Sequence, residues 1–211
     1  MNGVVFNEAH GERNQPERIV TLGIYLPVAA ALDAHGELRY VRETGASGYS
    51  ASDVADRKAT LQWTRLIDAL NQGRKWARER LFARLDGMVA AGVAVAVVPS
   101  HDPFVNEPPI RLLGQRLAQS QDRIDATGCL VRHTKIRRIV WGGPSYASLH
   151  RDTVRVEDAH RVAGRDVLLL DDIARSGASL RACRQMLLEA GAASVQAVAL
   201  GRVVAKQRTA S

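Results

Sequence analysis

The chain has few cysteines and no long apolar run, and both absences narrow what it can be. No apolar stretch in its 211 residues reaches the roughly 18 residues of a membrane-spanning helix. The 2 cysteines, Cys129 and Cys183, lack the spacing of metal ligands, so we expect buried thiols in a reducing compartment. Residues 1–17 are polar and have the pattern of neither a signal peptide nor a transit peptide. These features predict a cytoplasmic protein without a membrane segment.

Acidic residues are also fewer than basic ones. The chain has 22 Asp and Glu against 29 Lys and Arg, which gives a formal net charge of +7. A basic surface attracts polyanions, and both phosphorylated small molecules and nucleic acids belong to that class. Because 46% of the residues are hydrophobic and 24% are charged, the composition is that of an ordinary globular protein with a full core.

The expected strands and helices alternate along the chain. Apolar periodicity and turn residues predict the following elements: strands at 18–26 and 36–42, a long helix at 56–91 interrupted near 71–73 and ended by Gly92, a strand at 93–98, a helix at 109–121, strands at 129–133 and 167–170, a helix to 190 and a strand at 194–200. This order predicts an α/β fold, a parallel sheet flanked by helices. We expect a loose tail at 1–17, a small α+β extension at 18–91 and the α/β core at 92–211.

Two adjacent carboxylates, Asp171 and Asp172, follow the apolar run 167–170 and precede a turn with Ser176 and Gly177. A helix is expected to begin directly after this turn, so free backbone N–H groups and the positive end of the helix dipole meet there. Together with the hydroxyls of Ser176 and Ser179, they would bind an anion of phosphate size. The carboxylates would accept hydrogen bonds from sugar hydroxyls or hold Mg²⁺. The pattern therefore predicts a phosphosugar site.

Two other interpretations of this stretch stay open. Receiver domains of response regulators also place two acids after a strand, but there the acids lie near the start of the domain and no Ser-Gly turn follows. The turn could also do no more than cap the helix, because Ser176 is a good N-cap residue. Paired carboxylates argue against a plain cap, since like charges side by side need hydrogen bonds, a cation or solvent to compensate them.

The stretch resembles the phosphoribosyl-pyrophosphate (PRPP) loop of type I phosphoribosyltransferases. Asp171, Asp172, Ser176, Gly177 and Ser179 match the family's pattern. The resemblance implies that both aspartates take part in catalysis and hold Mg²⁺. It also implies a PRPP-binding loop made of Ala174, Arg175, Ser176, Gly177, Ala178 and Ser179. The loop departs from the family at Ala174, which is smaller than usual, and at Arg175, where a small residue is usual; a guanidinium there can itself pair with phosphate.

Two further segments fit the same resemblance. Ser100 and His101 follow the expected strand 93–98, where the family places its pyrophosphate loop, although Pro, Ser, His and Asp are also common in ordinary turns. Residues 135–151 correspond to the family's mobile hood, and His150 is the candidate proton donor or acceptor within it; the alternative is a surface histidine that caps a strand. In having a basic segment before Asp171 and Asp172, the chain is similar to the competence-associated (ComF-like) branch of the family.

The resemblance implies a Mg²⁺-dependent phosphoribosyltransferase that binds PRPP and an unidentified base and releases pyrophosphate. Two alternatives remain: a regulator that senses PRPP or a nucleotide without transfer, and a nucleic-acid-handling protein of competence, repair or phage defence. Weak nucleic-acid binding and a homodimer are compatible with each of these functions. Fold alone does not separate them, because one fold hosts many functions.

Overall fold

The computed structural model describes residues 5, 18–26, 28–32, 38–42, 57–105, 107–136 and 147–203, and a parallel β-sheet forms its centre. The strands of this sheet lie in the order β1-β9-β8-β4-β5, and every neighbouring pair is parallel. In this order their bounds are Val20–Thr21, Ser194–Arg202, Asp166–Ala174, Ala94–Val97 and Ile124–Asp125. Together with the helices beside it, this sheet confirms the predicted α/β fold class.

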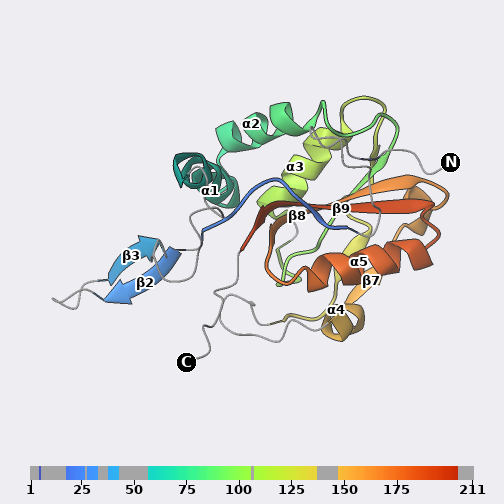
Figure 1. The fold of residues 1–211 in the computed structure, drawn as a ribbon. Coiled ribbons are helices and arrows are strands. Elements are labelled where there is room, and N and C mark those ends of the chain that lie inside the picture. Colours follow the sequence, from blue (N-terminus) through green and yellow to red (C-terminus); the bar gives the residue numbers. More distant parts are fainter. Residues whose placement is uncertain are drawn as a thin grey trace.

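Helices cover both faces of the sheet (Figure 1). One face carries α1 (Arg57–Asn71), α2 (Lys75–Leu85) and α3 (Pro109–Ala118); α5 (Ala178–Glu189) covers the other, with α4 (Ala147–Thr153) against it. A short 3₁₀ helix, Ala159–Arg161, precedes β8. No helix in the described ranges combines the length and the apolar character needed to cross a membrane.

The apolar run at the start of β8 is buried on both faces of the sheet. Leu168 and Leu170 belong to the core cluster that contains residues of α1, α2 and α3, whereas Val167 and Leu169 belong to the cluster that contains residues of α5. Alternate side chains of a strand point to opposite faces, so a strand covered on both sides must be apolar throughout. This is the physical reason why the unbroken run predicted a central strand.

The predicted helix over 56–91 is two helices. α1 ends at Asn71 and α2 begins at Lys75, and between them Gly73 has a φ of +75°, a left-handed conformation that glycine adopts at little cost. The interruption expected near 71–73 is thereby confirmed. The predicted end of the helix is wrong, because α2 stops at Leu85. Gly92 lies in the turn before β4, where its N–H donates to the Gln121 carbonyl, and it caps no helix.

The strand predicted at 129–133 exists, but it lies outside the central sheet. β6 (Leu130–Arg132) pairs antiparallel with β7 (Val154–Val156) in a separate small sheet. The edge beside β4 is occupied instead by the very short β5. Two residues of strand carry too little periodicity to be recognised in a sequence.

The N-terminal segment contributes to both the sheet and its covering. Within the strand expected at 18–26, only Val20–Thr21 is β-strand, and it pairs with β9. The strand expected at 36–42 is β3 (Leu38–Arg42), which pairs antiparallel with β2 (Val28–Leu32). Leu66, Leu81 and Val95 lie in one core cluster, so α1 and α2 share a core with the sheet. The division into a tail, an extension and a core stays a prediction, and residues 1–17 apart from Val5 lie outside the described residues.

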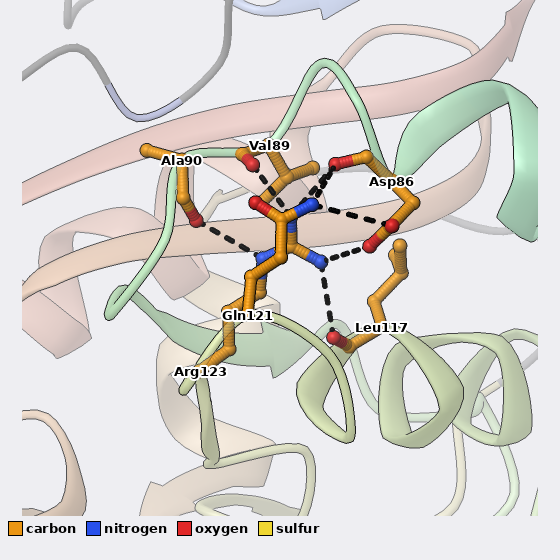
Figure 2. Close-up of polar contacts among 6 residues, drawn as sticks. All are labelled: Asp86, Val89, Ala90, Leu117, Gln121 and Arg123. Carbon is orange, nitrogen blue, oxygen red and sulfur yellow. Dashed lines mark hydrogen bonds and ion pairs between the residues drawn. The ribbon is translucent and has the colours of Figure 1, made fainter.

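A buried arginine joins the end of α2, the end of α3 and β5 (Figure 2). The guanidinium of Arg123 is fully buried and forms an ion pair of 2.6 Å with Asp86. It also donates hydrogen bonds to the main-chain carbonyls of Asp86, Val89, Ala90 and Leu117, at 2.8, 2.5, 3.0 and 3.1 Å. Burial acts to raise the pKa of Asp86, but the hydrogen bonds from Arg123, Ser120 and Gln121 outweigh it and leave that pKa lowered.

Trp63 joins α1 to the sheet, and its position leaves room only for a glycine at residue 23. The indole Nε1 of Trp63 donates to the Leu200 carbonyl at 2.8 Å. A Cβ at Gly23 would lie 2.6 Å from Trp63 Cδ1, so any side chain there displaces the ring. We expect Gly23→Ala to lower the free energy of unfolding by about 1 kcal/mol, the value of one lost hydrogen bond. Gly87→Ala is the control in denaturant titrations, since nothing lies within 4 Å of its added Cβ; equal losses would contradict the role of Gly23.

Candidate functional site

The sheet offers a ligand site where the chain leaves β4 and β8. These strands are neighbours, with Val97 beside Leu170, yet their connections diverge. From β4 the chain passes through α3 to β5, and from β8 it passes through α5, on the opposite face, to β9 (Figure 1). In parallel sheets, ligands bind at the carboxyl ends of strands where connections diverge in this way. The loop that follows β4 and contains Ser100 and His101, here the Ser100 loop, starts at this place. So does the segment from Asp171 to Gly177, here the acidic loop, whose first residues form the end of β8.

The first carboxylate of the pair, Asp171, is almost buried, with 8% of its surface exposed. β8 continues past it to Ala174, because β9 runs alongside and pairs with Asp171, Ile173 and Ala174. Asp171 Oδ1 accepts the N–H of Asp172 at 3.0 Å, and its Oδ2 accepts the Ser179 hydroxyl at 3.4 Å. Burial, reinforced by the negative charge of Asp172, raises the pKa of Asp171 well above its ordinary range.

The second carboxylate, Asp172, is tied to α1. Its Oδ2 accepts the side-chain amide of Asn71 at 2.9 Å, and its Oδ1 accepts the N–H of Ile173 at 2.7 Å. Asn71 was expected only as part of a helix interruption, so this contact was not foreseen. A polar residue at the end of a helix carries no signal of which strand it will face.

The donor set of the two aspartates fits a hydrated Mg²⁺. Among the described residues neither carboxylate forms an ion pair. Burial, and after it the repulsion from Asp172, raises the pKa of Asp171, and no basic side chain in the described part of the chain offsets either effect. Mg²⁺ prefers one or two carboxylates and takes its other ligands from water and substrate. The described residues contain no group of three or more His, Cys, Asp or Glu side chains that could hold a metal ion by themselves. Any cation here would therefore take part of its coordination from water or from a bound substrate.

The turn after β8 leads directly into α5. Gly177, with a φ of +71°, is the residue before the helix, and the Ser176 hydroxyl accepts the N–H of Ala178 at 3.3 Å. Arg181 holds the turn by donating to the Ser176 carbonyl at 2.8 Å. The strand, glycine turn and helix start thus follow in the predicted order. Within the predicted PRPP-binding residues, Ala174 and Ala178 are buried, Ser179 is half-buried, and Arg175 and Ser176 are exposed.

The Ser100 loop follows β4 and is fixed by several hydrogen bonds and an ion pair. The Ser100 hydroxyl accepts the N–H of Asp102 at 3.3 Å. Lys135 forms an ion pair of 2.6 Å with Asp102, and the Ile136 N–H donates to the His101 carbonyl at 3.1 Å. Hydrogen bonds from the Lys135 ammonium and from the Phe104 N–H hold the pKa of Asp102 below its ordinary value. The predicted hood therefore starts against the predicted pyrophosphate loop; residues 137–146 of the hood lie outside the described residues.

Arg132 lies behind this loop and was not singled out as a site residue from the sequence. It is buried, and its Nε donates to the Ser100 carbonyl at 2.6 Å. Its Nη1 donates to the Thr153 hydroxyl at 2.6 Å, and its Nη2 lies 3.4 Å from His150 Nδ1. An arginine directly after the apolar residues of a short strand is the signal that could have found it, since buried cations need several acceptors.

His150 is not a surface histidine, because only 2% of it is exposed. Burial and the nearby charge of Arg132 lower its pKa, so the ring favours its neutral form. Its Nε2 is buried and has no hydrogen-bond partner among the described residues. The structure therefore joins His150 to the Ser100 loop through Arg132 and gives it no contact with Asp171 or Asp172. Its predicted catalytic role stays a prediction.

The cysteines are buried, free thiols, as expected. Burial raises the pKa of both Cys129 and Cys183 to about 12, so neither forms a thiolate at neutral pH.

Comparisons with known proteins add little to this site. No family model matches the chain, and no curated protein matches it. Among solved structures, the chain is similar to a hypoxanthine phosphoribosyl transferase of Trypanosoma cruzi, with 15% identity over 71% of this chain and 70% of that chain and a TM-score of 0.33. A likeness of that size assigns neither a family nor an activity, so both rest on the residues themselves.

Proposed function

We propose that the chain is a Mg²⁺-dependent phosphoribosyltransferase that binds PRPP and transfers its phosphoribosyl group to a nitrogenous base. One observation carries the proposal. A pair of carboxylates and a Ser-Gly turn lie at the end of β8, beside the Ser100 loop at the end of β4, where the connections of the two strands diverge. Membership of the competence-associated branch stays a prediction.

The turn at Ser176 and Gly177 would bind the 5′-phosphate of PRPP. The first N–H groups of a helix have no partner within it, and α5 begins directly after Gly177. Arg175 is exposed at the same turn and would add a guanidinium to the phosphate. Asp171 and Asp172 would accept the ribose hydroxyls from the adjacent strand end.

The Ser100 loop would bind the pyrophosphate group. Arg132 donates a hydrogen bond to the Ser100 carbonyl of this loop, and Lys135, at the start of the hood, forms an ion pair with Asp102 in it. Asp171 and Asp172 would also hold the Mg²⁺ ion. When bound, that ion would neutralise the charge that develops on the departing pyrophosphate.

The reaction would form a bond from a base nitrogen to C1 of the ribose while the bond from C1 to the pyrophosphate oxygen breaks. Positive charge would develop on the ribose ring, and the carboxylates of Asp171 and Asp172 would favour it from beside the ring. The hood, residues 135–151, would exclude water from this centre by closing over it. The chain's part is thus orientation and preorganised charge, and it needs no covalent intermediate.

The direct test mixes purified protein with Mg²⁺, PRPP and a panel of nucleobases and measures pyrophosphate. We expect release that needs both Mg²⁺ and at least one of the bases. Calorimetry with Mg²⁺ and PRPP alone is the companion measurement. PRPP binding without release for any base would support the sensing alternative, and failure to bind PRPP would refute the proposal.

A further inference from the structure

A pocket of about 640 Å³ lies between α1, α2 and residues 22–24. This volume is in the range of small-molecule sites. Its wall combines two indole rings with three guanidinium groups, and no acidic residue lines it. The lining includes Trp63, Arg65, Leu66, Trp76, Arg80 and Arg84.

The α2 side of the pocket is one stripe of its helix. Trp76, Arg80 and Arg84 follow one another at intervals of four residues, which places them on the same face. All three are exposed, and Trp76 has 57% of its surface accessible. A large indole that is left this open offers a flat surface for stacking, at no cost to the hydrophobic core.

The α1 side is rigid. Trp63 is fixed by its hydrogen bond to the Leu200 carbonyl, and Leu66 beside it is buried in the core. The guanidinium of Arg84 lies over the Trp63 ring, 4.9 Å from its centre. One indole is therefore already covered by a cation, whereas Trp76 has no such cover among the described residues.

The charge of the pocket is unbalanced. In the described part of the chain, Arg65, Arg80 and Arg84 form no ion pair with an acid. Glu79, on the neighbouring part of α2, pairs with Arg78 and Arg116 instead. Three guanidinium groups around one cavity complement a ligand with several negative charges. Each guanidinium can donate two parallel N–H hydrogen bonds to the oxygens of one phosphate.

We propose that this pocket binds a nucleoside triphosphate, with the base stacked on Trp76 and the phosphates held by Arg65, Arg80 and Arg84. The cavity size favours a small molecule over a nucleic-acid strand. The site is separate from the proposed PRPP site, since neither the acidic pair nor the Ser176 turn lines it. The proposal therefore stands or falls independently of the transferase activity.

Calorimetry with ATP in the presence of a chelator tests the site without Mg²⁺. We expect ATP to bind more tightly than AMP, because fewer phosphates engage fewer arginines. Trp76→Ala should raise the Kd for ATP about tenfold, the value of a lost stacking contact, and Trp76→Phe should keep most of the affinity. Arg80→Gln should also raise the Kd about tenfold, through one lost charge-assisted contact.

The matched control is Arg165→Gln, which removes an exposed arginine and the same charge from another part of the surface. It should leave the Kd for ATP nearly unchanged, and so should Asp171→Asn combined with Asp172→Asn. Loss of ATP binding in that double variant would place the ligand in the acidic loop and overturn the proposal. Unchanged binding in Trp76→Ala and Arg80→Gln would overturn it as well, and so would tighter binding of a short oligothymidine strand than of ATP.

Discussion

Replacing Arg123 with methionine is expected to lower the free energy of unfolding by about 3–5 kcal/mol, the typical cost of breaking a buried ion pair. The methionine keeps most of the volume but removes the guanidinium that donates to the carboxylate of Asp86 and to four main-chain carbonyls. Asp86 keeps the side-chain amide of Gln121 as a donor. Denaturant titration followed by circular dichroism measures the loss. If the variant does not fold, Arg123→Lys is the substitute, because it keeps the charge but lacks the several N–H donors of the guanidinium. It should fold with a stability between those of the unchanged chain and the methionine variant.

Arg155→Met is the matched control. Arg155 pairs with Glu157 at 2.6 Å, the same distance as the pair of Arg123 with Asp86, but its side chain is 61% exposed where that of Arg123 is 0% exposed. Exposed pairs contribute about 0–1 kcal/mol. Burial therefore decides the difference between the two variants. A loss below about 1 kcal/mol in both would show that the Arg123 cluster is not a centre of stability.

The Arg123 cluster also predicts a pH dependence. The pKa of Asp86 is lower in the folded chain than its ordinary value of 3.8. A lowered carboxyl pKa contributes stability that is present above the unfolded pKa and is lost as the pH falls through the folded pKa. The free energy of unfolding should therefore fall on the acid side of pH 3.8, and Arg123→Met should reduce this dependence.

The double variant with Asp171→Asn and Asp172→Asn is expected to bind PRPP with Mg²⁺ at least about tenfold more weakly, a loss of about 1.4 kcal/mol. The two substitutions keep the volume and remove two charges, so the fold should survive. Removing the repulsion between the two carboxylates, which helps to raise the pKa of Asp171, should even favour folding. Calorimetry gives the Kd, and circular dichroism confirms the fold.

The control for the aspartate variant changes two exposed aspartates, Asp152→Asn and Asp158→Asn, and so alters the net charge equally. It should bind PRPP like the unchanged chain. Equal affinity in the folded Asp171 and Asp172 variant would remove the acidic loop from the proposed function.

The sequence predicted best those elements that a local pattern of residues determines. The run 167–170 and the turn at Gly177 determine strand and helix locally, and both were placed correctly. Pairing with distant segments was not predictable. β8 extends to Ala174 because β9 runs beside it, and β6 lies outside the sheet because β7 pairs with it instead. No local pattern specifies such partners.

The same limit applies to the candidate site. Asp171, Asp172 and the Ser176 turn were found because they are consecutive in the chain, and their spacing carries the chemistry. Asn71 and Arg132 reach the same region from other elements. Each looks in the sequence like an ordinary helix end or a basic strand residue, and only the fold brings it to the loop that it supports.

The pairing of β1 with β9 has a consequence for how the protein is made. The hydrogen bond from Gln196 to the Arg18 carbonyl joins residues 178 positions apart, so the first strand of the sheet is completed by the last. During synthesis, β1 cannot pair with β9 until residues 194–202 have left the ribosome. Closure of so long a loop is slow, which makes this edge of the sheet a late step of folding. A truncation that removes β9 would therefore also leave the N-terminal strand without a place in the sheet.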